Sequence, residues 1–92
     1  MVKRHRRDDN EQAVVDALER IGCTVFKIGR PVDLLVGFRA KNWLLEVKNK
    51  NGRDKLTEFQ QDWIPAWRGQ VRIVHTPQEA VDLVTGGYGG DR

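Results

Sequence analysis

Two neighbouring apolar segments, residues 32–38 (VDLLVGF) and 42–48 (NWLLEVK), constrain the fold of this chain more than any other feature. Both segments are rich in strand-forming residues, and the short connection between them predicts a β-hairpin. A turn that closes through Ala40 and Lys41 would pair Phe38 with Trp43. The rest of the fold must be arranged around this hairpin.

Three charged residues stand inside these apolar strands, where ionised groups cost free energy unless other groups compensate them. Side chains alternate along a strand, so Glu46 and Lys48 share a face. The expected register also puts Asp33 opposite Lys48 and one diagonal step from Glu46, so that all three project from one face. Glu11, in the first turn of a predicted N-terminal helix, can reach the cluster if that helix packs on the same face.

This cluster has two interpretations. Carboxylate oxygens on a rigid sheet suit a hard cation such as Mg²⁺ or Mn²⁺. A lysine beside them can position an attacking water or offset charge on a phosphate, and between two carboxylates it should stay protonated rather than act as a general base. The alternative is a half-buried network of ion pairs without chemistry, since such networks also occur in proteins that are not enzymes.

The remaining elements are predicted from local patterns. Helices are expected at residues 8–22, 56–69 and 76–84, and further strands at residues 23–28 and 71–75. Asp8 or Asp9 can cap the first helix, and Gly22 can end it. Thr57 can cap the second helix, and Pro65 should kink or fray its last turn. The third helix opens with a capping threonine and a proline at its first position.

The resulting order, α-β-β-β-α-β-α, predicts a small α/β sandwich with a mixed four-stranded sheet. The two hairpin strands have apolar residues on both faces, so helices are expected to cover both faces. The length of 92 residues indicates a single domain, which we place at residues 8–85. Residues 1–7 form a basic arm and residues 86–92 a glycine-rich tail, and both are expected to be mobile.

The net charge of +3 is unevenly distributed. Residues 1–7 hold four Lys/Arg and no acid, and residues 30–55 hold seven Lys/Arg against three Asp/Glu. Two separate basic blocks indicate a polyanion such as nucleic acid as partner, unless these charges only solvate the surface.

The single cysteine, Cys23, excludes an internal disulfide and a cysteine-rich zinc site. We expect it to be a small buried hydrophobic residue in an intracellular, cytoplasmic protein. No apolar run is long enough to span a bilayer, so no membrane association is expected. Nothing in the sequence indicates an organic cofactor.

Several motifs together resemble a known family. Asp33 follows a proline-containing turn, and the next strand carries Glu46-Val47-Lys48. The segment LTEFQQDW resembles a leucine–Ser/Thr–x–x–Gln helix, and GQVRIVHTPQEA resembles a closing strand and helix. These features are similar to the PD-(D/E)XK nuclease superfamily and to its VRR-NUC branch over residues 9–84. One departure is Val32, which separates the proline from Asp33, whereas the family usually has the two adjacent.

The resemblance implies a restriction-endonuclease-like fold and a metal-dependent nuclease that acts on DNA, with branched or junction DNA as an expected substrate. By position, Asp33 and Glu46 would bind Mg²⁺ or Mn²⁺, and Lys48 would be catalytic. Glu11 would match the acid of the first helix, and Gln60 the glutamine that supports the site. Stand-alone members of the family are often homodimers, so a homodimer is expected here.

Further residues complete the expected site. The Val47 carbonyl is a candidate additional metal ligand. The residues expected to hold the DNA backbone are Lys3, Arg4, Arg6, Arg7, Arg30, Arg39, Lys50, Arg53, Lys55 and Thr57. The last two lie at the start of the second helix, where free backbone N–H groups can hold a phosphate. Two other readings remain open: a non-catalytic nucleic-acid-binding module on the same fold, and a structural or assembly protein with a buried ion cluster.

Overall fold

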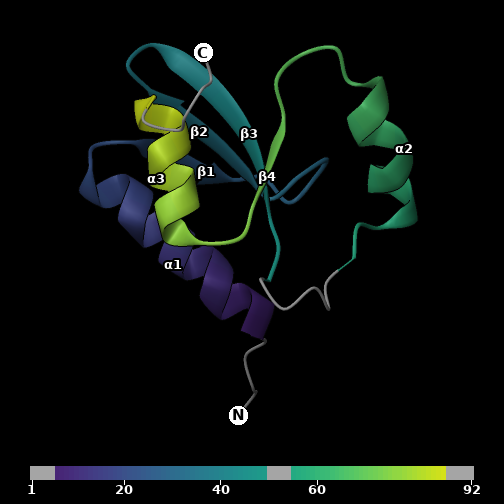
Figure 1. The fold of residues 1–92 in the computed structure, drawn as a ribbon, viewed down its shortest axis with the longest axis horizontal. Helices are drawn as coiled ribbons and strands as arrows, with labels where there is room; N and C mark the ends of the chain where they lie inside the picture. Colours follow the sequence, from purple (N-terminus) through teal and green to yellow (C-terminus); the bar gives the residue numbers. More distant parts are fainter. Residues whose placement is uncertain (1–5, 50–54, 87–92) are drawn as a thin grey trace.

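The computed structural model describes residues 6–49 and 55–86, and its elements follow the predicted order (Figure 1). The helices and strands are α1 (Arg6–Arg20), β1 (Thr24–Lys27), β2 (Leu34–Phe38), β3 (Lys41–Val47), α2 (Glu58–Ala66), β4 (Arg72–Val74) and α3 (Pro77–Thr85). Most of the expected basic arm and nearly all of the glycine-rich tail, residues 1–5 and 87–92, lie outside the described residues.

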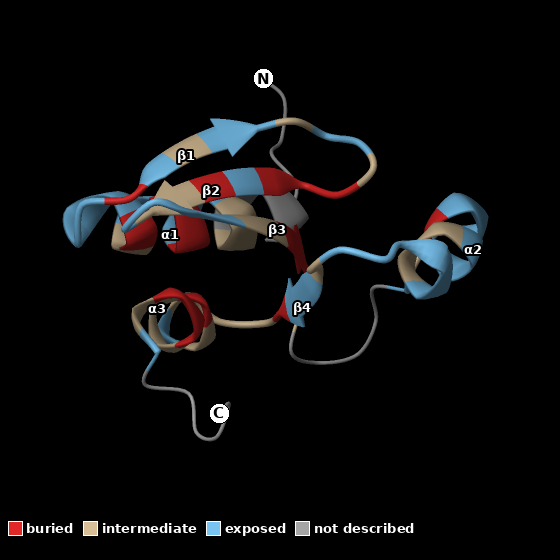
Figure 2. Ribbon diagram, turned by 90° about the horizontal axis from the view of Figure 1, so that it is seen from above, coloured by how far each residue is buried: buried red, intermediate tan, exposed pale blue. Residues whose placement is uncertain are grey.

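The sheet has the strand order β1-β2-β3-β4, with β1, β2 and β3 antiparallel and β4 parallel to β3. The predicted mixed four-stranded sheet is therefore confirmed. Helices α1 and α3 lie side by side against one face (Figure 2). Between them and the sheet lies the core, formed by Val14, Val15, Leu18, Cys23, Leu34, Val36, Leu45, Val47, Val74, Ala80, Leu83 and Val84.

The register of the hairpin differs from the prediction. Phe38 pairs with Lys41 rather than with Trp43, and the turn consists of Arg39 and Ala40, which have φ values of 53° and 66°. Two successive residues with positive φ are typical of the tight turns that match the twist of a hairpin. Because the error is two residues, every side chain stays on its predicted face.

The corrected register changes which charged residues are neighbours. The pair Leu34 and Leu45 is the last pair of the ladder, so its continuation brings Asp33 opposite Glu46 rather than opposite Lys48. The register therefore places the two acidic residues in facing positions just beyond the ladder, and the charge of Asp33 acts on Glu46.

The prediction that helices cover both faces of the sheet is wrong. Helix α2 stands apart from the sheet (Figures 1 and 2), and Gln60 is its only buried residue. Phe26, Leu35 and Ile73, which the strand pairing places on the same face as Glu46, are 66%, 38% and 38% exposed. We call this surface the open face of the sheet.

The helix ends agree with the local patterns, with one exception. Thr57 caps α2 and Thr76 caps α3, each through its side-chain oxygen, and Gly22 follows the end of α1 with a φ of 102°. Helix α1, however, begins at Arg6, so Asp8 and Asp9 lie inside it and neither is its cap. Two residues of the expected basic arm therefore belong to α1.

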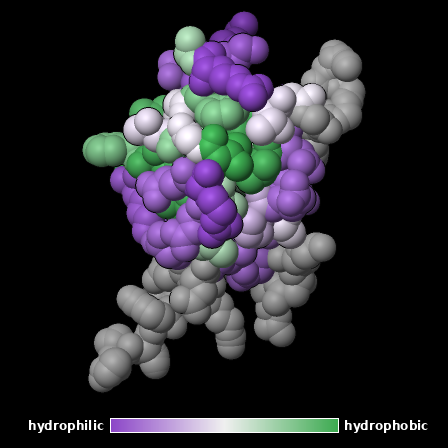
Figure 3. Space-filling model, turned by 90° about the vertical axis from the view of Figure 1, so that its left-hand side faces the viewer, coloured by the Kyte–Doolittle hydropathy of each residue, from purple (hydrophilic) through white to green (hydrophobic). Residues whose placement is uncertain are grey.

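The surface contains apolar areas besides the open face. Figure 3 shows one on the side of the molecule away from α2, bordered by hydrophilic residues. Ile21, the residue that follows α1, is another large hydrophobic residue at the surface and is 37% exposed. No helix within the described part of the chain is long and apolar enough to cross a membrane. Cys23 is buried, and burial raises the pKa of its thiol, so it behaves as a hydrophobic core residue.

Candidate active site

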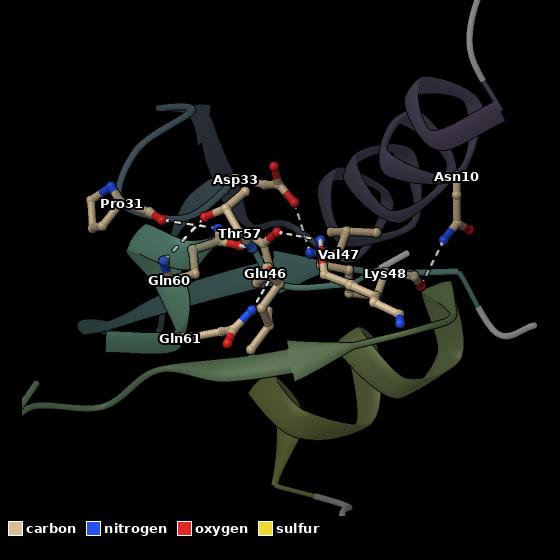
Figure 4. A network of polar contacts seen from close by, with 11 residues as sticks. Asn10, Pro31, Asp33, Glu46, Val47, Lys48, Thr57, Gln60 and Gln61 are labelled. Carbon is tan, nitrogen blue, oxygen red and sulfur yellow. Dashed lines mark hydrogen bonds and ion pairs between the residues drawn. The ribbon is translucent and has the colours of Figure 1, made fainter. Parts of the chain in front are cut away.

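Four polar side chains are buried in the part of the chain whose side chains are described, residues 10–49 and 55–86. They are Asp33, Glu46, Lys48 and Gln60, with exposed fractions of 9%, 1%, 6% and 6%. All four were singled out from the sequence, and the fold brings them to one place (Figure 4). Buried charges are rare unless they are paired or bind a ligand, so this cluster is the candidate site.

Glu46 and Lys48 occupy alternate positions at the end of β3. The Lys48 Nζ atom lies 3.3 Å from Glu46 Oε2 and donates a hydrogen bond of 3.0 Å to the carbonyl oxygen of Lys55. The ammonium group therefore connects the carboxylate to the segment that leads into α2. This arrangement fixes the direction of the lysine side chain.

The electrostatic environment of Glu46 is unfavourable for its charged form. Burial raises the pKa of this carboxyl above its ordinary value, and the negative charge of Asp33 raises it further. Lys48 and Gln60 oppose this shift without cancelling it. The second oxygen, Oε1, is buried and has no hydrogen-bond partner. One acceptor at the centre of the site thus remains unsatisfied by the protein.

Asp33 is held by the backbone of the neighbouring strand. Its Oδ2 atom accepts a hydrogen bond of 2.8 Å from the N–H of Val47 (Figure 4). Its own carbonyl oxygen accepts hydrogen bonds from Ile28 N (2.9 Å) and Gly29 N (3.3 Å), which close the turn that precedes β2. The carboxylate is therefore positioned by groups on both sides of it.

Gln60 links the first turn of α2 to the turn before Asp33. Its Oε1 atom accepts from Thr57 N (3.2 Å), its backbone N–H donates to the Thr57 hydroxyl (3.1 Å), and its Nε2 donates to the carbonyl of Pro31 (3.1 Å). Gln61, the alternative from the sequence, is exposed, and its side-chain amide donates to the carbonyl oxygen of Leu56 (3.0 Å). The buried glutamine beside the acids is therefore Gln60.

Asn10 is a member of this network that the sequence analysis missed. Its side-chain amide donates to the carbonyl oxygens of Lys48 (3.3 Å) and His75 (3.4 Å), and so joins α1 to the ends of β3 and β4. No sequence signal reveals this role, because the acceptors are backbone atoms that only the fold brings together.

The fold that carries this site is similar to that of a known protein. A solved structure described as a VRR_NUC domain superposes on this chain with a TM-score of 0.71 and 23% sequence identity. The match covers 92% of this chain and all of the other. This chain has the VRR-NUC fold. The resemblance stated from the sequence is thus confirmed at the level of the fold. No family model and no curated protein matches the sequence.

The VRR-NUC fold of this chain brings together two of the three expected acids. Asp33 and Glu46 are adjacent, whereas no group of three His, Cys, Asp or Glu residues in the described segments is arranged to hold a metal ion. The condition for Glu11 to reach the cluster is not met, because α1 packs on the core face of the sheet and not on the face of Glu46. Glu11 lies on α1 beside Asn10 and is partly buried, and it does not complete such a group. Its role as a ligand stays a prediction.

The expected DNA-binding residues are spread along this VRR-NUC fold. Arg30 lies in the turn before Asp33, close to the site, whereas Arg39 lies in the hairpin turn at the other end of β2. The separation of six positions between Asp33 and Arg39 corresponds to about 20 Å of strand. Four expected contacts, Lys3, Arg4, Lys50 and Arg53, lie outside the described residues, as do the side chains of Arg6 and Arg7.

The start of α2 offers less to a phosphate than the sequence suggested. Thr57 N donates to Gln60 Oε1, and Gln60 N donates to the Thr57 hydroxyl, so two of the N–H groups are already used in the cap. The Lys55 carbonyl accepts from Lys48. The expectation of free N–H groups is therefore wrong for these two.

Proposed function

We propose that this protein is a nuclease that uses a divalent metal ion to hydrolyse phosphodiester bonds in DNA. The observation that carries the proposal is Glu46, whose carboxylate is 1% exposed while its Oε1 has no hydrogen-bond partner. Buried acceptors are normally satisfied, so an open acceptor is unusual for an ion network with a purely structural role. A bound cation would satisfy this oxygen and offset the repulsion from Asp33.

The available donors fit Mg²⁺ or Mn²⁺. Both are hard ions that prefer oxygen ligands, and Mg²⁺ in particular is commonly held by one or two carboxylates together with waters and substrate phosphates. Asp33, Glu46 and the Val47 carbonyl would hold the ion, with Glu11 as a further ligand from α1. When bound, the ion would polarise the scissile phosphate and lower the pKa of a water molecule.

Lys48 and Gln60 would then have distinct tasks. The Lys48 ammonium has three N–H donors, so it can hold an attacking water or a phosphate oxygen while it contacts Glu46 and Lys55. Stabilising the charge that develops on the phosphate is the larger contribution expected from such a group. Gln60 is a positioning residue, because it fixes α2 to the turn that carries Asp33.

We further propose DNA, including branched or junction DNA, as the substrate. Arg30 and Lys55 lie near the site, and the other basic residues identified from the sequence would contact the sugar–phosphate backbone further away. Such contacts position a nucleic acid without reading its sequence. Cytoplasmic action is proposed together with this substrate.

The expected homodimer also remains a proposal. The strand pairing places Phe26, Leu35 and Leu44 in a row across three strands of the open face, and Phe26 is the most exposed large hydrophobic residue of the described chain. Contiguous apolar surface of this kind marks an interaction site. A second copy related by a two-fold axis would bury Phe26 against the equivalent residue, since such an interface pairs the same surface on both subunits.

One experiment tests the nuclease proposal. The parent protein and Glu46→Gln are incubated with linear and branched DNA in Mg²⁺, Mn²⁺ or EDTA, and the products are separated on a gel. Cutting by the parent alone, and only with metal, supports the proposal. A parent that binds DNA but never cuts it would be a binding module. A parent that neither binds nor cuts would point to a structural ion cluster.

A further inference from the structure

An exposed arginine–aromatic pair lies at the edge of the candidate site. The guanidinium carbon of Arg30 lies 4.5 Å from the ring centroid of Phe59, in cation–π geometry. Phe59 is 43% exposed and Arg30 is also exposed. The two residues come from different segments, the turn before β2 and the first turn of α2.

The position of this pair relative to Asp33 is held by hydrogen bonds. Ile28 N and Gly29 N donate to the carbonyl of Asp33, which fixes the turn that contains Arg30. Gln60, the residue after Phe59, donates to the carbonyl of Pro31, the residue after Arg30. The pair is therefore tied at both segments to the turn that carries the candidate metal ligand.

The ring of Phe59 has no role in the core. Helix α2 buries only Gln60, so Phe59 is not needed to attach the helix through apolar packing. A second arginine–phenylalanine pair within the described residues is different. Arg39 lies 4.8 Å from the ring centroid of Phe38, but Phe38 packs against the hydrophobic core. Phe59 is thus an aromatic ring whose surroundings leave it available to a ligand.

We propose that Arg30 and Phe59 form a stacking platform for an unpaired nucleobase next to the phosphate held at Asp33 and Glu46. This proposal rests on the proposed nuclease function and specifies its substrate. Aromatic rings and arginine planes stack with the faces of unpaired bases, whereas the bases within a duplex have both faces covered by their neighbours. DNA with a single-stranded segment beside the cutting site is therefore the preferred substrate.

The test compares two DNA molecules and two pairs of matched variants. Affinity is measured by fluorescence anisotropy in EDTA, where nothing is cut, for a blunt duplex and for a duplex with a short single-stranded gap. Phe59→Ala should weaken binding of the gapped DNA by roughly 5- to 100-fold and binding of the blunt duplex by less than about two-fold. Phe59→Trp, which keeps an aromatic face, should retain the preference. Arg39→Ala, which removes the same charge as Arg30→Ala but far from the site, should weaken both DNAs equally.

An abasic scan locates the stacked base. One base at a time is removed from the gap. With the parent protein, removal at one position should weaken binding as much as Phe59→Ala does. With Phe59→Ala, removal at that same position should cause no further loss of affinity. The platform would be overturned if Phe59→Ala weakened the binding of both DNAs equally. It would also be overturned if the losses from Phe59→Ala and from base removal added at every position of the gap. A change in molecular mass on Phe59→Ala would also overturn it, because the ring would then contact a second copy. A parent that shows the stacking pattern but does not cut in Mg²⁺ would instead contradict the nuclease function.

Discussion

Lys48 Nζ lies 3.3 Å from Glu46 Oε2, and both side chains are almost fully buried. Removing Lys48 and removing the charge of Glu46 should have opposite consequences for the fold. Without Lys48, the protein must bury an uncompensated carboxylate. Without the charge of Glu46, it loses the repulsion between Glu46 and Asp33. This asymmetry makes the pair a sensitive probe of whether a metal ion belongs in the site.

Lys48→Met should destabilise the metal-free protein by about 3–5 kcal/mol at neutral pH, as expected when one partner of a buried ion pair is removed. Mg²⁺ or Mn²⁺ should restore much of this stability, because the ion compensates Glu46 in place of the ammonium. Cutting should nevertheless remain at least about 10²-fold slower than in the parent, since a contact to the transition state is lost. Thermal melts with and without metal, and a cleavage assay, measure these effects. An ion network without chemistry would show no recovery with metal.

The contribution of Glu46 to the stability of the metal-free protein should fall as the pH rises above the ordinary glutamate pKa of 4.5. The folded protein holds the proton of Glu46 more tightly than the unfolded chain does. The stabilisation from this proton is therefore fully present below the ordinary glutamate pKa and is lost as the pH rises through the higher pKa of the folded state. Melting curves in EDTA between pH 4 and pH 8 should show the decline for the parent. Glu46→Gln has no titrating carboxyl at this position and should lack the decline that Glu46 causes. Identical profiles for the two proteins would contradict the raised pKa of Glu46.

Gln60→Leu should destabilise the protein by about 1–3 kcal/mol, because Thr57 N and the Pro31 carbonyl lose a partner in a partly buried region. In a domain of this size, each 1 kcal/mol corresponds to about 4–8 °C in melting temperature. Gln61→Leu is the matched control, since its side chain is exposed, and its melting temperature should change little. Equal effects of the two substitutions would mean that Gln60 does not anchor α2.

Asn10→Asp should be more harmful than Asn10→Ala. The aspartate has nearly the same shape as asparagine but cannot donate, so its oxygens would face the carbonyls of Lys48 and His75. Both the melting temperature and the cleavage rate should fall further for the aspartate variant. Gln12→Glu, an equivalent change at an exposed position of α1, provides the control. Better tolerance of aspartate than of alanine would rule out the two hydrogen bonds.

Phe26→Glu should convert the proposed homodimer into a monomer, because each subunit would place a charge in the centre of the interface. Light scattering at micromolar concentration measures the mass. Ile21→Glu introduces the same charge at an exposed residue outside the strands of the open face, where Ile21 is 37% exposed, and should leave the dimer intact. A parent that is monomeric with and without DNA would remove the dimer from the proposal.

The element order and the N-terminal caps of α2 and α3 follow from the sequence by itself, because they depend on local chemistry. Thr57 and Thr76 precede helical patterns, and Gly22 ends one. The candidate acids and Lys48 were also identifiable, since charged residues inside apolar strands require compensation. Gln60 emerged only through the resemblance to a known helix motif.

Other features were decided by the tertiary structure. The hairpin register depends on two residues with positive φ, Arg39 and Ala40, which are not residues that usually signal such a turn. The strength of an apolar strand pattern likewise does not reveal whether a helix covers it, and the open face around Phe26 was therefore mispredicted. The bonds of Asn10 and the stacking of Arg30 on Phe59 join segments far apart in the chain. Such contacts depend on how the elements pack in three dimensions, which local sequence patterns do not encode.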